Sequence, residues 1–154
     1  MTYEKVYPGM VLEGRWKATL RGPDGAVKRE IEGPNVVCTN GKEFLASFLS
    51  SAAAAASTFT MRYVGIGTDS TGETAANTAL GTELARVSGV VSYVSNQMYR
   101  VTGTFAAGTG TGAIVEYGLF SSSTGGTMLN RDTEAVINKG ASDSLEVRCD
   151  LTIS

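Results

Sequence analysis

The segment Asp143–Ser154, DSLEVRCDLTIS, shows the clearest alternation in the chain and decides its fold class. Apolar residues at positions 145, 147, 149, 151 and 153 alternate with polar residues at 146, 148, 150 and 152. Successive side chains of a β-strand point to opposite faces, so a period of two predicts a half-buried strand. We expect the apolar set to face the core.

A β-hairpin is predicted near the N-terminus by the same alternation. In VLEGRWKATLR, residues 11–21, one face carries Leu12, Gly14, Trp16, Ala18 and Leu20, and Trp16 is expected in the core. GPDG, residues 22–25, is a turn signal, and AVKREIEG, residues 26–33, returns as the second strand. We interpret residues 1–10 as an N-terminal arm and 11–154 as one domain. Whether the 11–33 hairpin is peripheral to that domain stays open.

One helix is predicted, at about residues 40–56. Asn40 and Glu43 have the spacing of a capping box. Phe44, Leu45, Phe48 and Leu49 then recur at helical spacing. The run Ala52–Ala56 extends the helix, because Ala has the highest helix propensity.

The rest of the chain shows β patterns. We predict strands in MRYVGIG (61–67), RVSGVVSYV (86–94), MYRVTGTFA (98–106), AIVEYGLF (113–120), TMLNRD (127–132) and EAVIN (134–138). In RVSGVVSYV, Val87, Gly89, Val91 and Tyr93 share one face. About eight short strands at this spacing predict a mostly β fold, an antiparallel β-sandwich or a jelly-roll-like domain with one helix.

Composition narrows the function class. The chain of 154 residues has a net charge of -2 and only 18% charged residues, against the usual ~25%. It therefore lacks the basic face of a nucleic-acid binder. The N-terminus has no apolar signal-peptide core, and no run approaches the ~20 apolar residues of a membrane helix. We expect a soluble protein, made in a reducing cytoplasm, whose sparsely charged, Gly-rich surface suits either contact with other proteins or a plain β-domain.

The two cysteines, Cys38 and Cys149, each lie among apolar residues and in no C-x-x-C motif. We interpret both as reduced core thiols. A disulfide stays open, because the sequence does not give their separation.

Residues for catalysis or metal binding are scarce. The chain has no histidine, which excludes Ser-His-Asp and Cys-His catalysis and the commonest zinc ligand. No acidic run has the spacing of a calcium loop. We expect neither enzymatic activity nor a metal or cofactor. A spatial pair of carboxylates stays open. Glu116, inside an apolar strand, is the candidate buried acid, although an outward or strand-end carboxylate is the favoured interpretation.

The stretch YVGIGTDSTGETAANTALGTELAR, residues 63–86, is rich in small residues and was compared with known phosphate-binding loops. From Gly67 it has Glu73 where a Walker loop needs lysine, and a carboxylate repels phosphate. GTGTG, residues 108–112, precedes a strand where a dinucleotide fingerprint needs a helix. We expect neither loop to bind phosphate. Instead we predict a short helical turn capped by Thr78, with Leu80 and Leu84 inward and Glu83 and Arg86 paired or facing a partner.

Four ordered motifs resemble a family of tailed-bacteriophage virion proteins. They are a Y-[IV]-[AG]-[IV]-G-T-G strand, matched at Tyr63–Thr68, T-A-L-G-x-E-x-x-R at Thr78–Arg86, T-G-x-[IV]-x-E-x-G-L-F at Thr111–Phe120, and N-K-x-x-x-D-[ST]-L-x-V at Asn138–Val147. The helix with Gly41 fits the family's upstream pattern. The resemblance covers about residues 35–154 and leaves out the hairpin.

The resemblance implies a non-enzymatic structural part of a virion, assembled from protein made in the host bacterial cytoplasm. A capsid decoration, or cement, protein is favoured, with the major capsid protein and copies of itself, expected as a trimer around a symmetry axis, as partners. The alternatives are a tail, baseplate or fibre-attachment protein, or a carbohydrate- or receptor-binding β-sandwich module. The expected partner-interface residues are Tyr3, Val6 and Tyr7 in the arm, with Thr78, Glu83 and Arg86.

Overall fold

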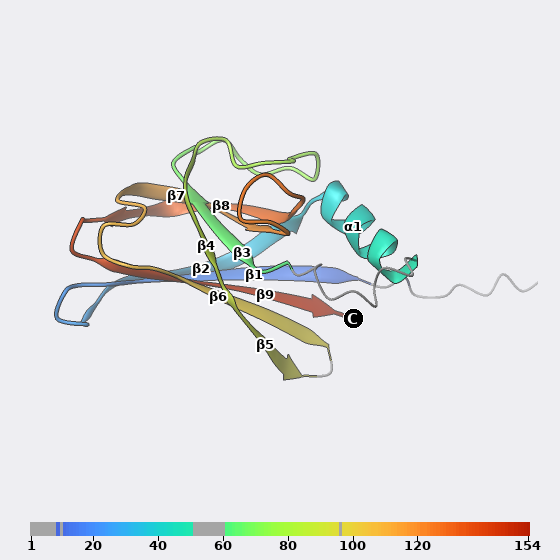
Figure 1. The fold of residues 1–154 in the computed structure, drawn as a ribbon, viewed down its shortest axis with the longest axis horizontal. Coiled ribbons are helices and arrows are strands. Elements are labelled where there is room, and N and C mark those ends of the chain that lie inside the picture. The colour runs from blue at the N-terminus through green and yellow to red at the C-terminus, as the bar shows by residue number, and fades with distance from the viewer. Residues whose placement is uncertain (1–8, 10, 51–60, 96) are drawn as a thin grey trace, which may run out of the picture.

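The computed structural model describes residues 9, 11–50, 61–95 and 97–154, which form one sheet and one helix (Figure 1). The strands are β1 (Leu12–Arg21), β2 (Val27–Val37), β3 (Tyr63–Gly67), β4 (Glu83–Ser88), β5 (Val90–Ser95), β6 (Met98–Phe105), β7 (Gly112–Phe120), β8 (Met128–Lys139) and β9 (Ser144–Ile153), and the helix is α1 (Thr39–Ser50). The predicted mostly β class with a single helix is confirmed. The helix of the structure, among the described residues, is too short and too polar to cross a membrane.

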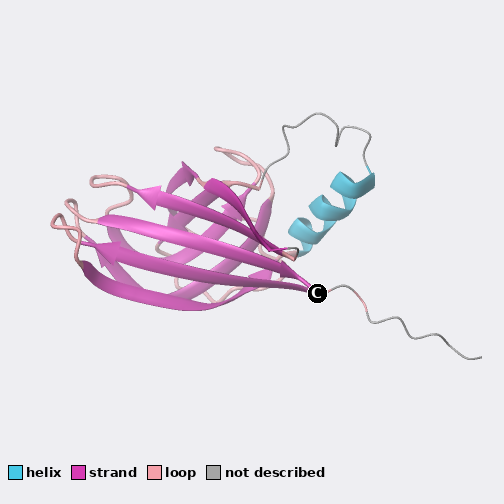
Figure 2. Cartoon of the chain, turned by 90° about the horizontal axis from the view of Figure 1, so that it is seen from below, coloured by secondary structure: helices cyan, strands magenta, loops and turns pink. Residues whose placement is uncertain are grey.

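The nine described strands form a single antiparallel sheet in the order β4-β3-β7-β8-β2-β1-β9-β6-β5. Its two edge strands, β4 and β5, are consecutive in the chain and are separated only by Gly89. The Gly89 N–H donates to the carbonyl of Arg62, just before β3, at 2.7 Å. The two edges therefore approach each other, and the sheet curls into a nearly closed barrel (Figure 2).

The core lies between the two halves of this curled sheet. Trp16 of β1 and Tyr117 of β7 pack with their ring centroids 6.1 Å apart, and both side chains are buried. The 11–33 hairpin is central, because β1 lies between β2 and β9 and directs Trp16, Ala18 and Leu20 into the core. The face predicted for β1 is thus the buried one, apart from Leu12, which is only partly buried.

Several element boundaries differ from the sequence-based prediction. β2 runs on through Pro34 and changes partner, pairing with β1 up to Asn35 and with β8 at Val36 and Val37. β8 is one long strand where two short ones were predicted. The helix begins at Thr39, so Asn40 lies inside the first turn and does not cap it. The predicted extension through residues 51–56 lies outside the described residues.

The predicted strand over residues 86–94 is broken at Gly89 into β4 and β5. Val91 and Tyr93, predicted to share one face with Val87 and Gly89, are 40% and 76% exposed. The ladder between β3 and β4 ends at the Tyr63–Ser88 pair, so β5 lies beyond the end of the opposing strand. Ile153, at the end of β9, is likewise 40% exposed, although Leu145, Val147, Cys149 and Leu151 are buried as predicted.

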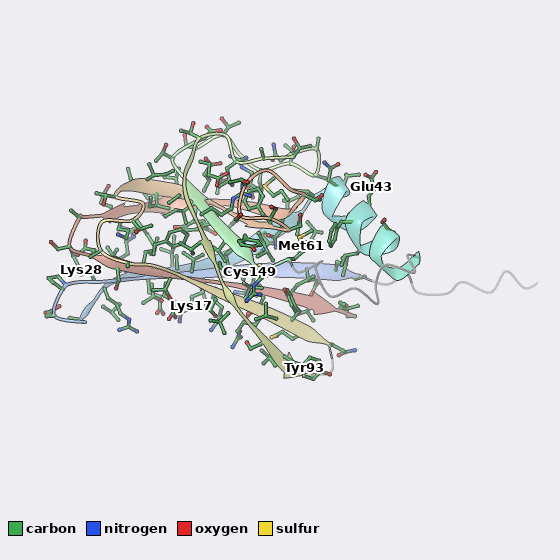
Figure 3. All side chains as sticks on the ribbon, viewed as in Figure 1. Lys17, Lys28, Glu43, Met61, Tyr93 and Cys149 are labelled. Atoms are coloured by element: carbon green, nitrogen blue, oxygen red, sulfur yellow. The ribbon has the colours of Figure 1, made fainter. Side chains whose placement is uncertain are left out.

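Both cysteines are free, buried thiols, which confirms the interpretation as core residues. Cys149 lies in the main core, where burial raises the pKa of its thiol to about 12 (Figure 3). Cys38 belongs to a smaller cluster with Phe120 and Met128, and burial raises its pKa as well. Both thiols are therefore protonated at neutral pH and are poor nucleophiles.

Replacement of Trp16 tests the central position of the hairpin. We expect Trp16→Ala to lower the free energy of unfolding by about 3–5 kcal/mol, because it leaves a large cavity against Tyr117. Arg15→Ala, at an exposed position of the same strand, should change it by no more than ~0.5 kcal/mol. Urea unfolding followed by far-UV circular dichroism measures both, and equal effects would contradict a core role for β1.

Candidate functional site

The connection between β3 and β4, residues 68–82, is the most elaborate loop of the structure. It forms bends and turns but no helical turn, and Glu83 already begins strand β4, so the predicted capped helical turn is wrong. Leu80 is buried as predicted, but Leu84 is 42% exposed. The loop lies over the outer face of β3 and β7, where it covers a buried charge.

That charge is Glu116, in the middle of β7, whose side chain is fully buried. The favoured interpretation of Glu116 as an outward or strand-end carboxylate is therefore wrong. Its Oε1 accepts hydrogen bonds from the backbone N–H groups of Asp69 and Thr82 at 3.2 and 2.8 Å. Its Oε2 accepts one from the N–H of Gly81 at 2.9 Å. The loop thus wraps its own backbone donors around an internal carboxylate.

Arg131 of β8 neutralises this carboxylate. Its Nε and Nη2 donate to Glu116 Oε2 at 3.1 and 2.9 Å, and both side chains are buried. Its Nη1 reaches into the loop, donating to the carbonyl of Thr71 at 2.9 Å and to Oδ1 of Asn77 at 3.4 Å. A buried ion pair is tolerated when further hydrogen bonds satisfy its remaining groups, as they do here.

Gly67 and Gly81 have no side chain, and the carboxylates of this site occupy the space that a side chain at either position would need. A Cβ at Gly67 would lie 2.3 Å from Glu116 Oε1, and a Cβ at Gly81 would lie 1.7 Å from Asp69 Oδ2. Asp69 also accepts from the backbone N–H and hydroxyl of Thr71, and these bonds hold its pKa below the ordinary value. The small residues of the loop are therefore required by close packing around an internal anion.

A second pair of glycines makes room for the apolar part of the loop. Gly65 of β3 and Gly118 of β7 are paired across the sheet, and a Cβ at either would lie within 3.2 Å of Leu80. Leu80 and Phe120 fill the trough above them and join the cluster with Cys38 and Met128. The 68–82 loop is thus held on β3 and β7 both by hydrogen bonds to Glu116 and by the apolar contacts of Leu80.

Glu83 and Arg86, predicted to pair or to face a partner, form an ion pair on β4 with 2.7 Å between Arg86 Nη2 and Glu83 Oε2. The Arg86 guanidinium lies 3.5 Å from the centroid of the Phe120 ring. Its Nη1 donates to the carbonyls of Ser122 and Gly125, at 2.8 Å each. Arg86 therefore fastens the β7–β8 turn to β4 from within the molecule.

The structure does not bring the predicted partner-interface residues together as a set. Glu83 and Arg86 meet on β4, and Thr78 is exposed on the 68–82 loop. Tyr3, Val6 and Tyr7 lie outside the described residues. Their contact with a partner stays a prediction.

A further acidic group lies between β2 and β8, which diverge beyond their short pairing at Val36 and Val37. Asp132 is 1% exposed and its Oδ2 has no hydrogen-bond partner. Burial, together with Glu134 and Glu73, raises its pKa to about 7. The hydroxyl of Tyr117, which is paired with Asp132 across the sheet, also has no hydrogen-bond partner.

The chemistry open to these groups is limited. Glu116 is saturated with donors from the loop and from Arg131, so it offers no free lone pair to a substrate. Among the described residues, no group of Cys, Asp and Glu side chains is arranged to hold a metal ion. A shallow, open hollow beside α1 is lined by Asn40, Glu43, Phe44, Ser47 and Thr127. In the Gly67–Thr74 segment the N–H of Asp69 donates to Glu116, and those of Thr68, Thr71 and Thr74 donate to acceptors within the loop.

Sequence reasoning missed Arg131, Asp69 and Asp132. Glu116 was noticed as an acid inside an apolar strand, and such an acid needs a buried cation from a neighbouring strand. The signal that could have identified Arg131 is its position in TMLNRD, the next predicted strand after the one that contains Glu116. Comparisons with protein-family models, with curated proteins and with solved structures give no match.

Substitution of Glu116 tests the importance of the ion pair. We expect Glu116→Gln to lower the free energy of unfolding by about 3 kcal/mol, since it leaves the buried Arg131 with only the part-exposed Asp69, 3.6 Å from its Nη2, as a counter-charge. Hydrogen exchange of the Gly81 and Thr82 amides should accelerate in the same variant, because they lose their acceptor.

Glu83→Gln is the matched control, because Glu83 is paired with an arginine but is exposed. Its effect on the free energy of unfolding should stay below ~1 kcal/mol. Urea unfolding with far-UV detection compares the two variants. A Glu116→Gln protein as stable as the Glu83→Gln protein would contradict the role given to the pair.

The raised pKa of Asp132 leads us to expect that the stability of the protein depends on pH. Its pKa is raised from 3.8 to about 7 in the folded protein, so between these values the folded state binds more protons than the unfolded state. The free energy of unfolding should therefore fall as pH rises from 4 to 7, by up to about 4 kcal/mol, because the buried side chain is little screened by solvent. Asp132→Asn should flatten this slope in urea unfolding between pH 4.5 and 8, while Asp24→Asn, at an exposed turn, should keep it. An unchanged slope in Asp132→Asn would contradict the assignment.

Proposed function

We propose that this chain is a non-enzymatic structural component of a tailed-phage virion, and that it decorates the capsid as a cement protein. Such a protein bridges neighbouring capsid subunits and adds interface area against the pressure of packaged DNA. Repeated contacts multiply through valency, so each contact needs only modest affinity.

The observation that carries the proposal is what the resembling motifs do in the fold. Gly67, Gly81 and Glu116 belong to those motifs, and they build the anchor of the 68–82 loop. Arg86, from the same set, fastens the adjacent turn. These motif residues hold a surface of the molecule in shape, which supports a structural role.

The surface that this anchor holds also supports the proposal. The exposed residues of the loop are small and uncharged, beside the partly exposed carboxylates of Asp69 and Glu73: Thr68, Ser70, Thr71, Gly72, Thr74, Ala75, Ala76, Thr78, Ala79, Gly81 and Thr82. Small side chains lose little conformational entropy on contact and permit close approach of a neighbour. A fixed surface of small, mostly uncharged residues suits docking by shape onto a protein lattice.

Expanded shells without decoration test the cement role. We expect the purified protein to bind them saturably, and Thr78→Arg to weaken that binding by about tenfold or more, since a long charged side chain would enter a close contact. Thr104→Arg, an equivalent change at an exposed position of β6, should leave binding unchanged. Co-sedimentation with shells measures both variants.

Binding to tail tubes but not to shells would move the protein to the tail or baseplate, and a low copy number per particle would agree with that position. Binding on a glycan array without binding to either particle would favour a carbohydrate-recognition module. Either result would contradict the cement role.

A further inference from the structure

The junction between β2 and β8 is the shortest strand pairing in the sheet. It consists of two residue pairs, at Val36 and Val37, whereas every other pair of neighbouring strands in the described sheet shares at least five. The N–H of Cys38 extends it by donating to the carbonyl of Leu129 at 2.9 Å. We call this junction the β2–β8 seam. Few backbone hydrogen bonds therefore join β2 to β8, and junctions of this kind open most readily.

Three polar side chains beside the seam are buried without a hydrogen-bond partner. On β8, Asp132 is 1% exposed and its Oδ2 has none, and the hydroxyl of Tyr117, the residue paired with it, has none either. On β2, both Oδ1 and Nδ2 of Asn35 are buried and unpaired. Burial of a polar group without a hydrogen bond costs free energy. Since opening the seam would let water reach these groups, they favour opening.

Like charges also gather at the seam. The carboxylate of Glu134 reaches from β8 to β2, where it occupies the space that a Cβ at Gly33 would need. Glu73 of the 68–82 loop accepts a hydrogen bond from the hydroxyl of Thr133, next to Asp132. Burial first, and then Glu134 and Glu73, raise the pKa of Asp132 to about 7. Loss of the Asp132 proton therefore places a buried negative charge near two others.

The other charged and titratable groups around Asp132 leave this charge without a counter-ion. Tyr117 and Cys149 are neutral at pH 7, because burial raises the pKa of both. Arg29 of β2 is a cation, and it acts on Tyr117. Arg131 is engaged in its buried ion pair, and it points to the opposite face of β8 because successive side chains of a strand alternate.

Beyond the seam, β2 and β8 separate, and an ion pair joins β2 to the turn after β8. Lys28 Nζ lies 3.0 Å from both carboxylate oxygens of Asp143. The Lys28 side chain is 50% exposed, and an ion pair with so exposed a partner contributes little to stability. The ion pair therefore adds little to the free energy of opening.

We propose that the β2–β8 seam is a built-in opening point of the barrel, closed while Asp132 is protonated and opened locally when Asp132 loses its proton. In the closed seam the ionised carboxylate is buried near like charges, whereas in the open seam water solvates it. The closed state therefore binds more protons than the open state, and opening becomes easier as pH rises from about 4 to about 7.

The opening is sub-global. The ladder between β7 and β8 and the ion pair of Glu116 with Arg131 lie on the other side of β8 from the seam and remain intact. This inference goes beyond the proposed virion role and does not depend on it.

Native-state hydrogen exchange of the full chain between pH 4.5 and 8 tests the proposal. We expect the protection factor of the Cys38 amide, corrected for intrinsic exchange, to fall by about tenfold or more between pH 5 and 7. At each pH the free energy of opening at Cys38 should be smaller, and less dependent on urea, than that of amides in the β1–β9 ladder, which open only on global unfolding.

Charge variants separate the role of Asp132 from a general effect of pH. Asp132→Asn should remove the pH dependence of Cys38 protection. Glu134→Gln should move the fall in protection to lower pH, because it removes one like charge. Glu146→Gln, at an exposed position of β9, is the matched control and should keep the profile of the unaltered chain.

Far-UV circular dichroism verifies that the three variants are folded. The proposal is overturned if the Cys38 amide opens with the same free energy and urea dependence as the β1–β9 ladder. It is also overturned if the pH dependence at Cys38 survives in Asp132→Asn, or if Glu134→Gln behaves like Glu146→Gln.

Discussion

The buried ion pair between Glu116 and Arg131 is the interaction on which the position of the 68–82 loop over the sheet depends. It joins β7 to β8 and, through three backbone donors and two loop acceptors, it fixes residues 68–82 on the sheet. A buried carboxylate without these partners would be strongly destabilising. The loop and the ion pair therefore require each other, and the glycines at 67 and 81 follow from the space that the carboxylates take.

This arrangement explains why so many small residues lie between β3 and β4. Part of the loop provides N–H groups to the interior, and Leu80 fills the trough above Gly65 and Gly118. What remains on the outside is a surface of mostly threonine, alanine, serine and glycine, with Asp69 and Glu73 partly exposed. A surface held in this way changes little on contact, so a partner that docks on it has little ordering entropy to overcome. The proposed structural role in a virion depends on that property.

The two edges of the barrel present different surfaces. At β4, Glu83 and Arg86 form an ion pair, and the arginine is further engaged with Phe120 and the β7–β8 turn. At β5 the edge is neutral and apolar. Gly89 separates the two, so one continuous segment changes from a charged, internally bonded strand to an uncharged, exposed one.

The sequence by itself determined the β class, the buried faces of β1 and most of β9, and the single helix, because period-two and helical patterns are local properties. It predicted that both cysteines lie in the core but left a disulfide open, and the structure decided that both thiols are free. It did not determine which side of the sheet would be covered at Glu116, Val91 or Tyr93. Glu116 is buried because a distant arginine and a loop converge on it, and Tyr93 is exposed because the opposing ladder ends at Ser88. Both outcomes depend on where strands far apart in the chain begin and end beside one another. Only the tertiary structure decided them, because burial of a charge or exposure of an apolar side chain is a property of the neighbours and not of the local pattern.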